Sequence, residues 1–183
     1  GRNAEAVHAL EQAERLFQAA VGARALEQLP IQLGLSDLAL ARGDFEEAKH
    51  RADLALELAE LLRVPARDRL EVLIVQTNVA VGRDPAAAVR SARAVLELLA
   101  SGSFAPDDQL RGLYTRLVLT EQLLELGRHA EAEAEAEGLL AALAHHDDAS
   151  LVPLRDAASA AAAAARRARE ATIMPASAEV EPR

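Results

Sequence analysis

Several residue types are scarce or missing in this 183-residue sequence, and each absence excludes a kind of structure or chemistry. There is no cysteine, which excludes disulfides, thiolate nucleophiles and Cys-containing zinc sites. Aromatic residues make up 2% of the chain, so alanine and leucine must fill the core; the aromatics are Phe17, Phe45, Phe104 and Tyr114. Because alanine favours helices and lets them approach closely, this composition predicts closely packed helices.

Long apolar runs and an excess of positive charge are missing as well. No run reaches the ~18 residues of a membrane-spanning helix, and the N-terminus has no signal-peptide pattern, so we expect a cytoplasmic protein that does not enter the membrane. The formal net charge of −9 has the wrong sign for a phosphate backbone, so we expect no direct nucleic-acid binding by this segment. The chain starts at Gly1 in the middle of a repeat, and we therefore expect it to be a fragment of a longer protein.

An internal repeat becomes visible when the chain is aligned on four glycines. They are Gly1, Gly43, Gly82 and Gly127, which lie 42, 39 and 45 residues apart. The positions five, nine and twelve residues further on hold mostly small side chains: Ala6, Ala48, Ala87 and Ala132, then Leu10, Ala52, Ser91 and Ala136, then Ala13, Ala55, Ala94 and Leu139. Glycine at a helix end adopts a left-handed conformation that other residues enter only at a cost. Each copy is therefore predicted to be a helix, a tight turn and a second, antiparallel helix.

Capping signals and loops define the predicted helices. Asp44 and Glu47 have the form of a capping box, and Asp84 precedes a proline whose missing N–H is harmless at a helix start. The pattern predicts helices over residues 3–21, 24–42, 45–62, 66–81, 85–101, 107–126, 129–145 and 150–171, with a loop over 101–106. Residues 172–183 contain two prolines and little to bury, so we expect a disordered tail.

The fullest copy, with Leu35-Ser36, Gly43, Phe45, Ala48 and Ala55, has the spacing of a known repeat. It resembles the tetratricopeptide repeat (TPR), with a small residue, a turn glycine, an aromatic residue two positions on and alanines five and twelve positions on. The family's tryptophan is missing, and the units are longer than the usual length of roughly 34 residues. The chain is therefore similar to the long-helix subclass seen in kinesin light chains and in the sensor arms of bacterial regulators. The resemblance implies an all-α fold over residues 1–171, a right-handed superhelical stack of antiparallel helix hairpins (a TPR-like α-solenoid).

In the TPR family the first helix of each hairpin lines a concave surface that binds partners, and the resemblance carries this expectation to particular residues. Three polar residues stand six positions before the turn glycines: Asp37, Gln76 and Glu121. The apolar residues expected on the same face are Leu33, Leu40, Val72, Val79, Tyr114, Leu117 and Leu124. Such a mixed groove suits an extended or helical peptide. The alternative is that these polar residues are simply solvated and that the chain's own terminal helix fills the groove.

Two further clusters have both a structural and a functional interpretation. His145, His146, Asp147 and Asp148 are adjacent, whereas metal ligands on a helix need a spacing of three or four, so we expect a helix end followed by a capping aspartate and no metal. Four glutamates alternate with alanine: Glu131, Glu133, Glu135 and Glu137. Both residue types favour helices over strands, so we expect a helix with a solvated acidic face. Recognition of a basic partner is the alternative.

No signature of catalysis is found in the sequence, since it has no nucleophile elbow, no glycine-rich phosphate loop and no histidine pair with functional spacing. We therefore predict no enzyme, no catalytic or metal site and no cofactor. The predicted function is a protein-interaction and sensing scaffold that binds a peptide or partner domain, as part of a larger bacterial signalling protein or transcription regulator. The alternative is a dimerisation or spacer arm, in which Ala- and Leu-rich end faces pair between two copies to form a homodimer.

Overall fold

In a computed structural model the chain is described over residues 2–21, 26–146 and 148–173, and every regular element in this part is a helix. The helices form two compact units, Gly1–Gln109 and Leu110–Arg183. Within the described ranges, none of the helices is long and apolar enough to span a membrane.

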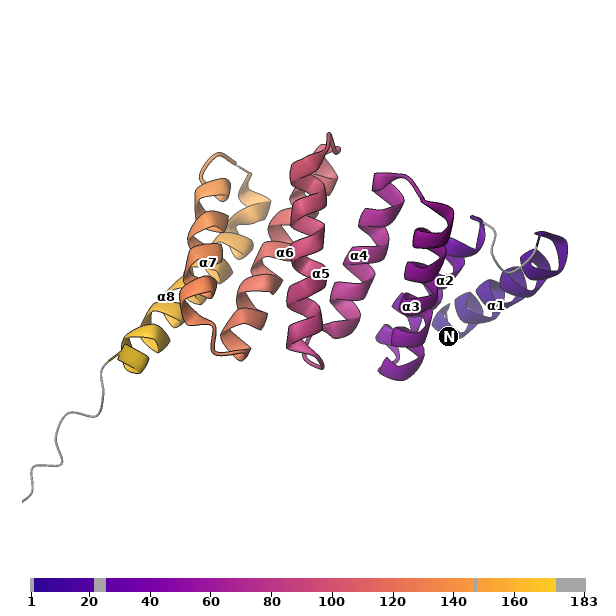
Figure 1. Cartoon of the computed structure of the whole chain (residues 1–183), viewed down its shortest axis with the longest axis horizontal. Helices are drawn as coiled ribbons and strands as arrows, with labels where there is room; N and C mark the ends of the chain where they lie inside the picture. The colour runs from indigo at the N-terminus through magenta and orange to yellow at the C-terminus, as the bar shows by residue number, and fades with distance from the viewer. Residues whose placement is uncertain (1, 22–25, 147, 174–183) are drawn as a thin grey trace, which may run out of the picture. The chain divides into compact units, whose positions relative to one another are not determined.

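Unit 1 contains two helix hairpins preceded by a single helix (Figure 1). Its helices are α1 (Arg2–Val21), α2 (Gln28–Ala41), α3 (Phe45–Leu62), α4 (Ala66–Ala80) and α5 (Pro85–Ser101). The hairpin α2–α3 packs against α4, and α4 forms the second hairpin with α5. In each hairpin the turn is short, so the two helices run antiparallel and lie side by side.

Unit 2 contains one hairpin and a terminal helix. Helix α6 (Pro106–Glu125) begins in the last residues of unit 1 and continues into unit 2, where it is followed by α7 (His129–Leu143), the 3₁₀-helix η1 (Ala149–Leu151) and α8 (Val152–Ile173). Helices α7 and α8 pack against each other along their lengths. Leucines of α6, α7 and α8 form the core of the unit, among them Leu139, Leu143 and Leu154. The all-α class and the antiparallel hairpins predicted from the sequence are confirmed.

The predicted turn glycines adopt the left-handed conformation, with φ of 76° at Gly43, 69° at Gly82 and 69° at Gly127. At Gly43 and Gly127 the backbone closes a Schellman motif, in which the residue after glycine donates its N–H to a carbonyl five residues earlier. The bonds are Asp44 N to Ala39 O and Arg128 N to Leu123 O, each 2.9 Å. The predicted first glycine, Gly1, lies outside the described residues.

The turn at Gly82 differs from the other two, and this shifts the repeat by one residue. Val81 has φ −55° and ψ 128°, and Arg83 N donates to Ala80 O at 3.0 Å, so residues 80–83 form a type II turn with glycine at its third position. Helix α5 consequently starts three residues after its glycine, whereas α3 and α7 start two residues after theirs.

The alanine seams confirm the repeat in α3 and α7 and correct it in α1 and α5; in α1 the predicted Ala6 is exposed and the next residue, Val7, is buried instead. The predicted positions are buried in α3 and α7, with Ala48, Ala52, Ala55, Ala132, Ala136 and Leu139 at most 1% exposed. In α5 the predicted Ala87, Ser91 and Ala94 are only partly buried. The next residues in the chain, Ala88, Ala92 and Val95, are fully buried instead. The extra turn residue at Gly82 rotates α5 by one position relative to the glycine alignment.

Both predicted helix caps are present. Asp44 Oδ1 accepts a hydrogen bond from Glu47 N at 3.3 Å, and Asp84 Oδ1 accepts one from Ala87 N at 2.9 Å. Pro85 occupies the first helical position of α5, where its lack of an N–H costs nothing. These caps fix where α3 and α5 start, and hence the register of the buried alanines.

Two predicted helix ends are wrong. Helix α2 was expected to begin at residue 24, but Leu26 and Glu27 form a turn and the helix begins at Gln28. Because Pro30 then lies in the first turn, it removes no intrahelical hydrogen bond, whereas a start at residue 24 would have placed it in the interior. Helix α8 continues to Ile173, past the predicted start of the tail, and the remainder of that tail lies outside the described residues.

Candidate peptide-binding surface

A pocket of about 360 Å³ lies in unit 1 between α2 and α4, the first helices of neighbouring hairpins. Its apolar lining comes from the first turns of α2 and from a residue in the turn before this helix: Leu26, Leu29, Pro30 and Leu33. Leu26 is 49% exposed, while Leu29 is 3% exposed and belongs to the core beneath. Leu29 and Leu33, four positions apart, lie on one face of α2, and so do Pro30 and Leu33, three positions apart.

The polar lining of this pocket is acidic. Glu27 precedes α2, and Asp68 and Glu71 lie in the first turns of α4. Among the described residues no lysine, arginine or histidine lines the pocket. The arrangement therefore combines an apolar surface with three carboxylates, which suits an apolar side chain next to a cationic one.

Some of the predicted groove residues of unit 1 are part of the hydrophobic core. Val72 is fully buried between α2 and α3, and Val79 is 8% exposed among Ala39, Ala48 and Ala52. Val72 is therefore not available at a surface, which corrects the sequence prediction for this residue, whereas the largely buried Val79 still reaches a pocket described below. Helix α4 has neighbours on both sides, so its apolar positions serve packing first.

The remaining predicted residues of unit 1 lie in different surroundings. Leu33 lines the α2–α4 pocket and packs on the core, and Leu40 packs on the core of the same hairpin. Asp37 is exposed on α2. Gln76 instead faces α3, where its Nε2 donates to Asp53 Oδ1 at 3.2 Å.

Gln76 and Val79 line a separate pocket of about 390 Å³ formed by α3, α4, α5 and the turn between α4 and α5. Here the guanidinium of Arg83 stacks over the ring of Phe45, with its central carbon 3.6 Å from the ring centroid. Lys49 pairs with Asp53 on the same helix. Both acidic and basic groups thus line this pocket, and Lys49 and Asp53 form an ion pair there.

In unit 2, the predicted groove residues all belong to α6. Tyr114 is 48% exposed, and Leu117 packs against the core of α7 and α8. Leu124 is half-buried. Glu121 lies at the surface, but partial burial, together with the neighbouring charge of Glu125, raises its pKa. Of these residues, Leu117 therefore serves the core of the unit, whereas Tyr114 and Glu121 lie at the surface.

The predicted solvated acidic face of α7 is only partly present: Glu131 and Glu137 are exposed, Glu133 is buried, and all four alternating glutamates pair with arginines. Glu133 is 7% exposed and lies between Arg166, at 3.0 Å, and Arg169, at 3.1 Å, both on α8. The others pair similarly: Glu131 with Arg128, Glu135 with Arg116 and Glu137 with Arg166.

The predicted helix end near His145 contains the expected capping aspartate. Asp148 accepts a hydrogen bond from Ser150 N at 2.8 Å at the start of η1, and this bond lowers the pKa of its carboxyl. His145 and His146 are exposed, and Asp147 lies outside the described residues. Among the described residues, no three acidic or histidine side chains are grouped so that they could hold a metal ion.

The acidic residues of the α2–α4 pocket were not predicted from the sequence. The predicted polar groove residues stand six positions before Gly43 and Gly82, near the ends of α2 and α4, whereas the pocket lies at the beginnings of these helices. The usable signal was the run Leu26-Glu27 before Pro30, in which a leucine and an acidic residue precede a proline that lies in the first turn of a helix.

Comparison with known proteins supports the fold. No protein-family model and no curated protein matches the sequence. One similar solved structure is a crystal structure of a Podosopora anserina protein, named as a kinesin light chain with nearly identical TPR-like repeats. The TM-score is 0.75 at 21% sequence identity, and the match covers 93% of this chain and 80% of that chain. The chain therefore has the fold of TPR-like helical repeats.

Proposed function

We propose that this chain is a protein-interaction scaffold that binds a peptide in the pocket between α2 and α4. The observation that supports the proposal is the pocket itself, about 360 Å³ in volume, with a leucine-rich surface on α2 and carboxylates at the start of α4. Its volume is in the range of roughly 300–1,000 Å³ typical of ligand pockets. The fold supports it as well, because stacked hairpins present rigid surfaces to other chains.

The chemistry of the pocket indicates which peptide it would take. An apolar side chain would pack on Leu29 and Leu33, while a lysine or arginine beside it would approach Asp68. The electrostatic attraction between this cation and the carboxylate is stronger when the contact is partly shielded from water. The same attraction also increases the rate of association. We therefore expect peptides with a leucine next to a lysine or arginine to bind, and glutamate-containing ones to be rejected.

The test is the affinity of a labelled leucine–lysine peptide, measured by fluorescence anisotropy. Asp68→Lys should weaken binding about tenfold, because it replaces attraction by repulsion. Asp107→Lys makes the same change of charge in the first turn of α6 and lines none of the pockets described above, so it should stay within about twofold of the parent. Equal affinity for the matched leucine–glutamate peptide, or equal effects of the two variants, would refute the proposal.

A second candidate function is a dimerisation or spacer arm. It is supported by α1, a helix that packs against α2 and on which Leu16 is 63% exposed and Phe17 is 38% exposed. Exposed large apolar side chains on a helix are suited to pairing with a second copy. Sedimentation over a wide concentration range tests this, since a homodimer should form and be lost in the Leu16→Ser/Phe17→Ser double variant. A monomer at every concentration would exclude it.

The wider setting is a proposal from sequence resemblance. We propose that the scaffold acts in the cytoplasm as the interaction arm of a larger bacterial signalling protein or transcription regulator. Sequencing the reading frame on either side of this segment tests it. A regulatory or DNA-binding domain in the same frame is expected, and a frame that encodes no further domain would contradict it.

A further inference from the structure

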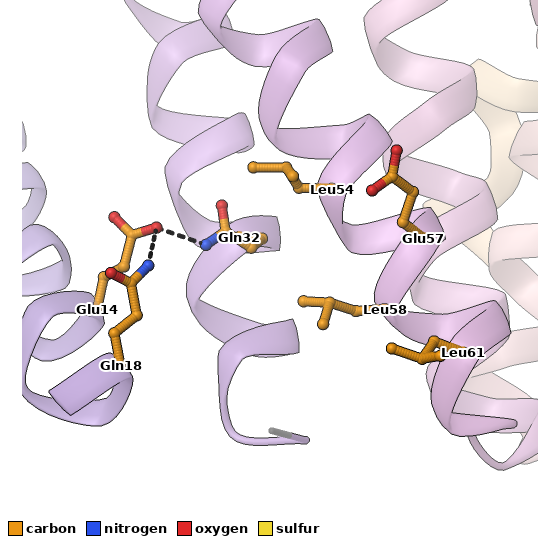
Figure 2. A pocket seen from close by; sticks show the side chains of 7 residues that line it. All are labelled: Glu14, Gln18, Gln32, Leu54, Glu57, Leu58 and Leu61. Carbon is orange, nitrogen blue, oxygen red and sulfur yellow. Dashed lines mark hydrogen bonds between the residues drawn. The ribbon is translucent and has the colours of Figure 1, made fainter. Parts of the chain in front are cut away.

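A further pocket of unit 1 lies between α1 and α3, and its lining differs from those of the two pockets described above. Its volume is about 390 Å³, and Figure 2 shows its two walls. One wall is a stripe of leucines on α3, namely Leu54, Leu58 and Leu61. The opposite wall is polar, with Glu14 and Gln18 of α1. The α2–α4 pocket shares none of these residues.

The leucine wall is accessible at its outer end. Leu58 is 8% exposed, but Leu61, one turn further along α3, is 55% exposed. Spacings of four and three residues place the three leucines along one line on the helix. A large leucine exposed to this extent beside a cavity is an apolar surface without a covering partner in the described part of the chain.

The polar wall is already ordered by hydrogen bonds within the chain. Glu14 Oε1 accepts from Gln32 Nε2 at 2.7 Å and from Arg51 Nη1 at 2.8 Å. Gln18 Nε2 lies 3.4 Å from the same oxygen (Figure 2). Arg51 also binds Glu47, so one cation serves two carboxylates. Excess negative charge therefore remains around the pocket.

Glu57 adds a further carboxylate at the rim, on the same helix as the leucines. It is exposed, and the structure gives it no ion pair or hydrogen bond with any other described residue. No basic residue lines the pocket among the described residues. A leucine wall, a polar wall and an unpaired acidic rim together complement a helix with an apolar face and a basic face.

We infer that the pocket between α1 and α3 is a second docking site, which takes a basic amphipathic helix of a partner protein. Its apolar face would pack on Leu58 and Leu61, and its lysines or arginines would approach Glu57 and the polar wall of α1. The site is separate from the one proposed above, since Gln32 lines this pocket and Leu33 lines the other, and neighbouring residues on a helix point about 100° apart.

The experiment is the binding of a synthetic helical peptide, about five turns long with leucines on one face and lysines on the other, to the full chain. Glu57→Lys should weaken binding about tenfold, and Leu61→Ser by a similar factor through lost apolar contact. Glu60→Lys is the matched control, because Glu60 is also exposed on α3 but does not line the pocket. Affinity for Glu60→Lys and for Asp68→Lys should stay within about twofold of the parent.

The outcomes of this experiment distinguish the proposed docking site from other modes of binding. Equal weakening by Glu57→Lys and Glu60→Lys would mean binding by net charge alone and would overturn the proposal. If only Asp68→Lys weakens binding, the peptide binds in the α2–α4 pocket. This result would also overturn the present proposal, while leaving the first proposal intact. Absence of saturable binding up to about 100 μM, or a dimer that Leu61→Ser converts to a monomer, would likewise refute it.

Discussion

Arg51 of α3 donates a hydrogen bond from Nη1 to Oε1 of Glu14 on α1, at 2.8 Å, across 37 residues of sequence. Both side chains are largely buried, with 16% and 15% of their surfaces exposed. Among the described residues of α1, Val7 is the only apolar residue that is buried. Helix α1 is therefore held to its neighbours in large part by a polar network centred on Glu14.

The first prediction concerns this network. Glu14→Ala should lower the free energy of unfolding by about 1–3 kcal/mol, because Gln32 and Arg51 lose their acceptor in a largely buried position. Urea denaturation measures the loss, and hydrogen exchange should show faster opening of α1 than of α4. Glu5→Ala, at an exposed position of α1, is the control and should change the free energy by less than about 0.5 kcal/mol. Equal effects of the two variants would show that the network does not hold α1.

The second prediction concerns the contact between α7 and α8. Glu133→Gln should lower the free energy of unfolding by about 1 kcal/mol, since the amide keeps the shape while the arginines, which are about half exposed, can be hydrated. Arg166→Ala/Arg169→Ala should cost more, because it leaves a buried carboxylate without its cations. Thermal unfolding at neutral pH measures which of the two variants loses more stability. Arg128→Ala, in an exposed pair, is the control and should have little effect. The reverse order for Glu133 and its arginines would contradict the structure.

The third prediction concerns residues in the left-handed conformation. Gly127 has φ 69° and no atom within 4 Å of an added Cβ, so Gly127→Ala should cost about 1 kcal/mol through backbone strain alone. Gly127→Asn should cost less, because asparagine tolerates this conformation better. Arg63 has φ 50° at the end of α3, so Arg63→Gly should be stabilising by up to about 1 kcal/mol. Chemical denaturation of the three variants tests the signs, and a stabilising Gly127→Ala would contradict the turn geometry.

The fourth prediction is a pH dependence at Glu121. Partial burial and then the charge of Glu125 raise its pKa above 4.5, so the folded state binds a proton more tightly than the unfolded state. Proton binding at Glu121 therefore stabilises the folded state below pH 4.5, and this stabilisation is lost as the pH rises through the folded-state pKa. Glu121→Gln should therefore be slightly more stable than the parent at pH 7, and the advantage should disappear below pH 4.5. In a carboxyl NMR titration, Glu125→Gln should lower the pKa of Glu121, and an unchanged pKa would exclude the charge effect.

The helices and turns could be predicted from the sequence because their signals are local. Gly43 and Gly127, the caps at Asp44 and Asp84 and the buried alanines all lie within a few residues of the feature they determine. The alignment failed by one residue in α5, since a type II turn and a Schellman motif both require glycine but differ in where the next helix starts.

The binding surface was harder to predict because it depends on contacts distant in sequence. Helical periodicity shows that Val72 is on an apolar face, but it does not tell whether a neighbouring helix or solvent covers that face. The pairing of Glu133 with Arg166 joins positions 33 residues apart, and no local pattern indicates it. Leu26, Glu27 and Asp68 meet only because α2 and α4 pack side by side.

The proposed role as a peptide-binding scaffold is tested most directly by an NMR titration of the full chain, uniformly labelled with ¹⁵N, with the leucine–lysine peptide. The amide signals of the first turns of α2 and α4, around Leu29, Leu33 and Asp68, should move in a saturable way, and they should move much less in Asp68→Lys. Signals that do not move, or that move equally in Asp68→Lys and the parent, would contradict the account.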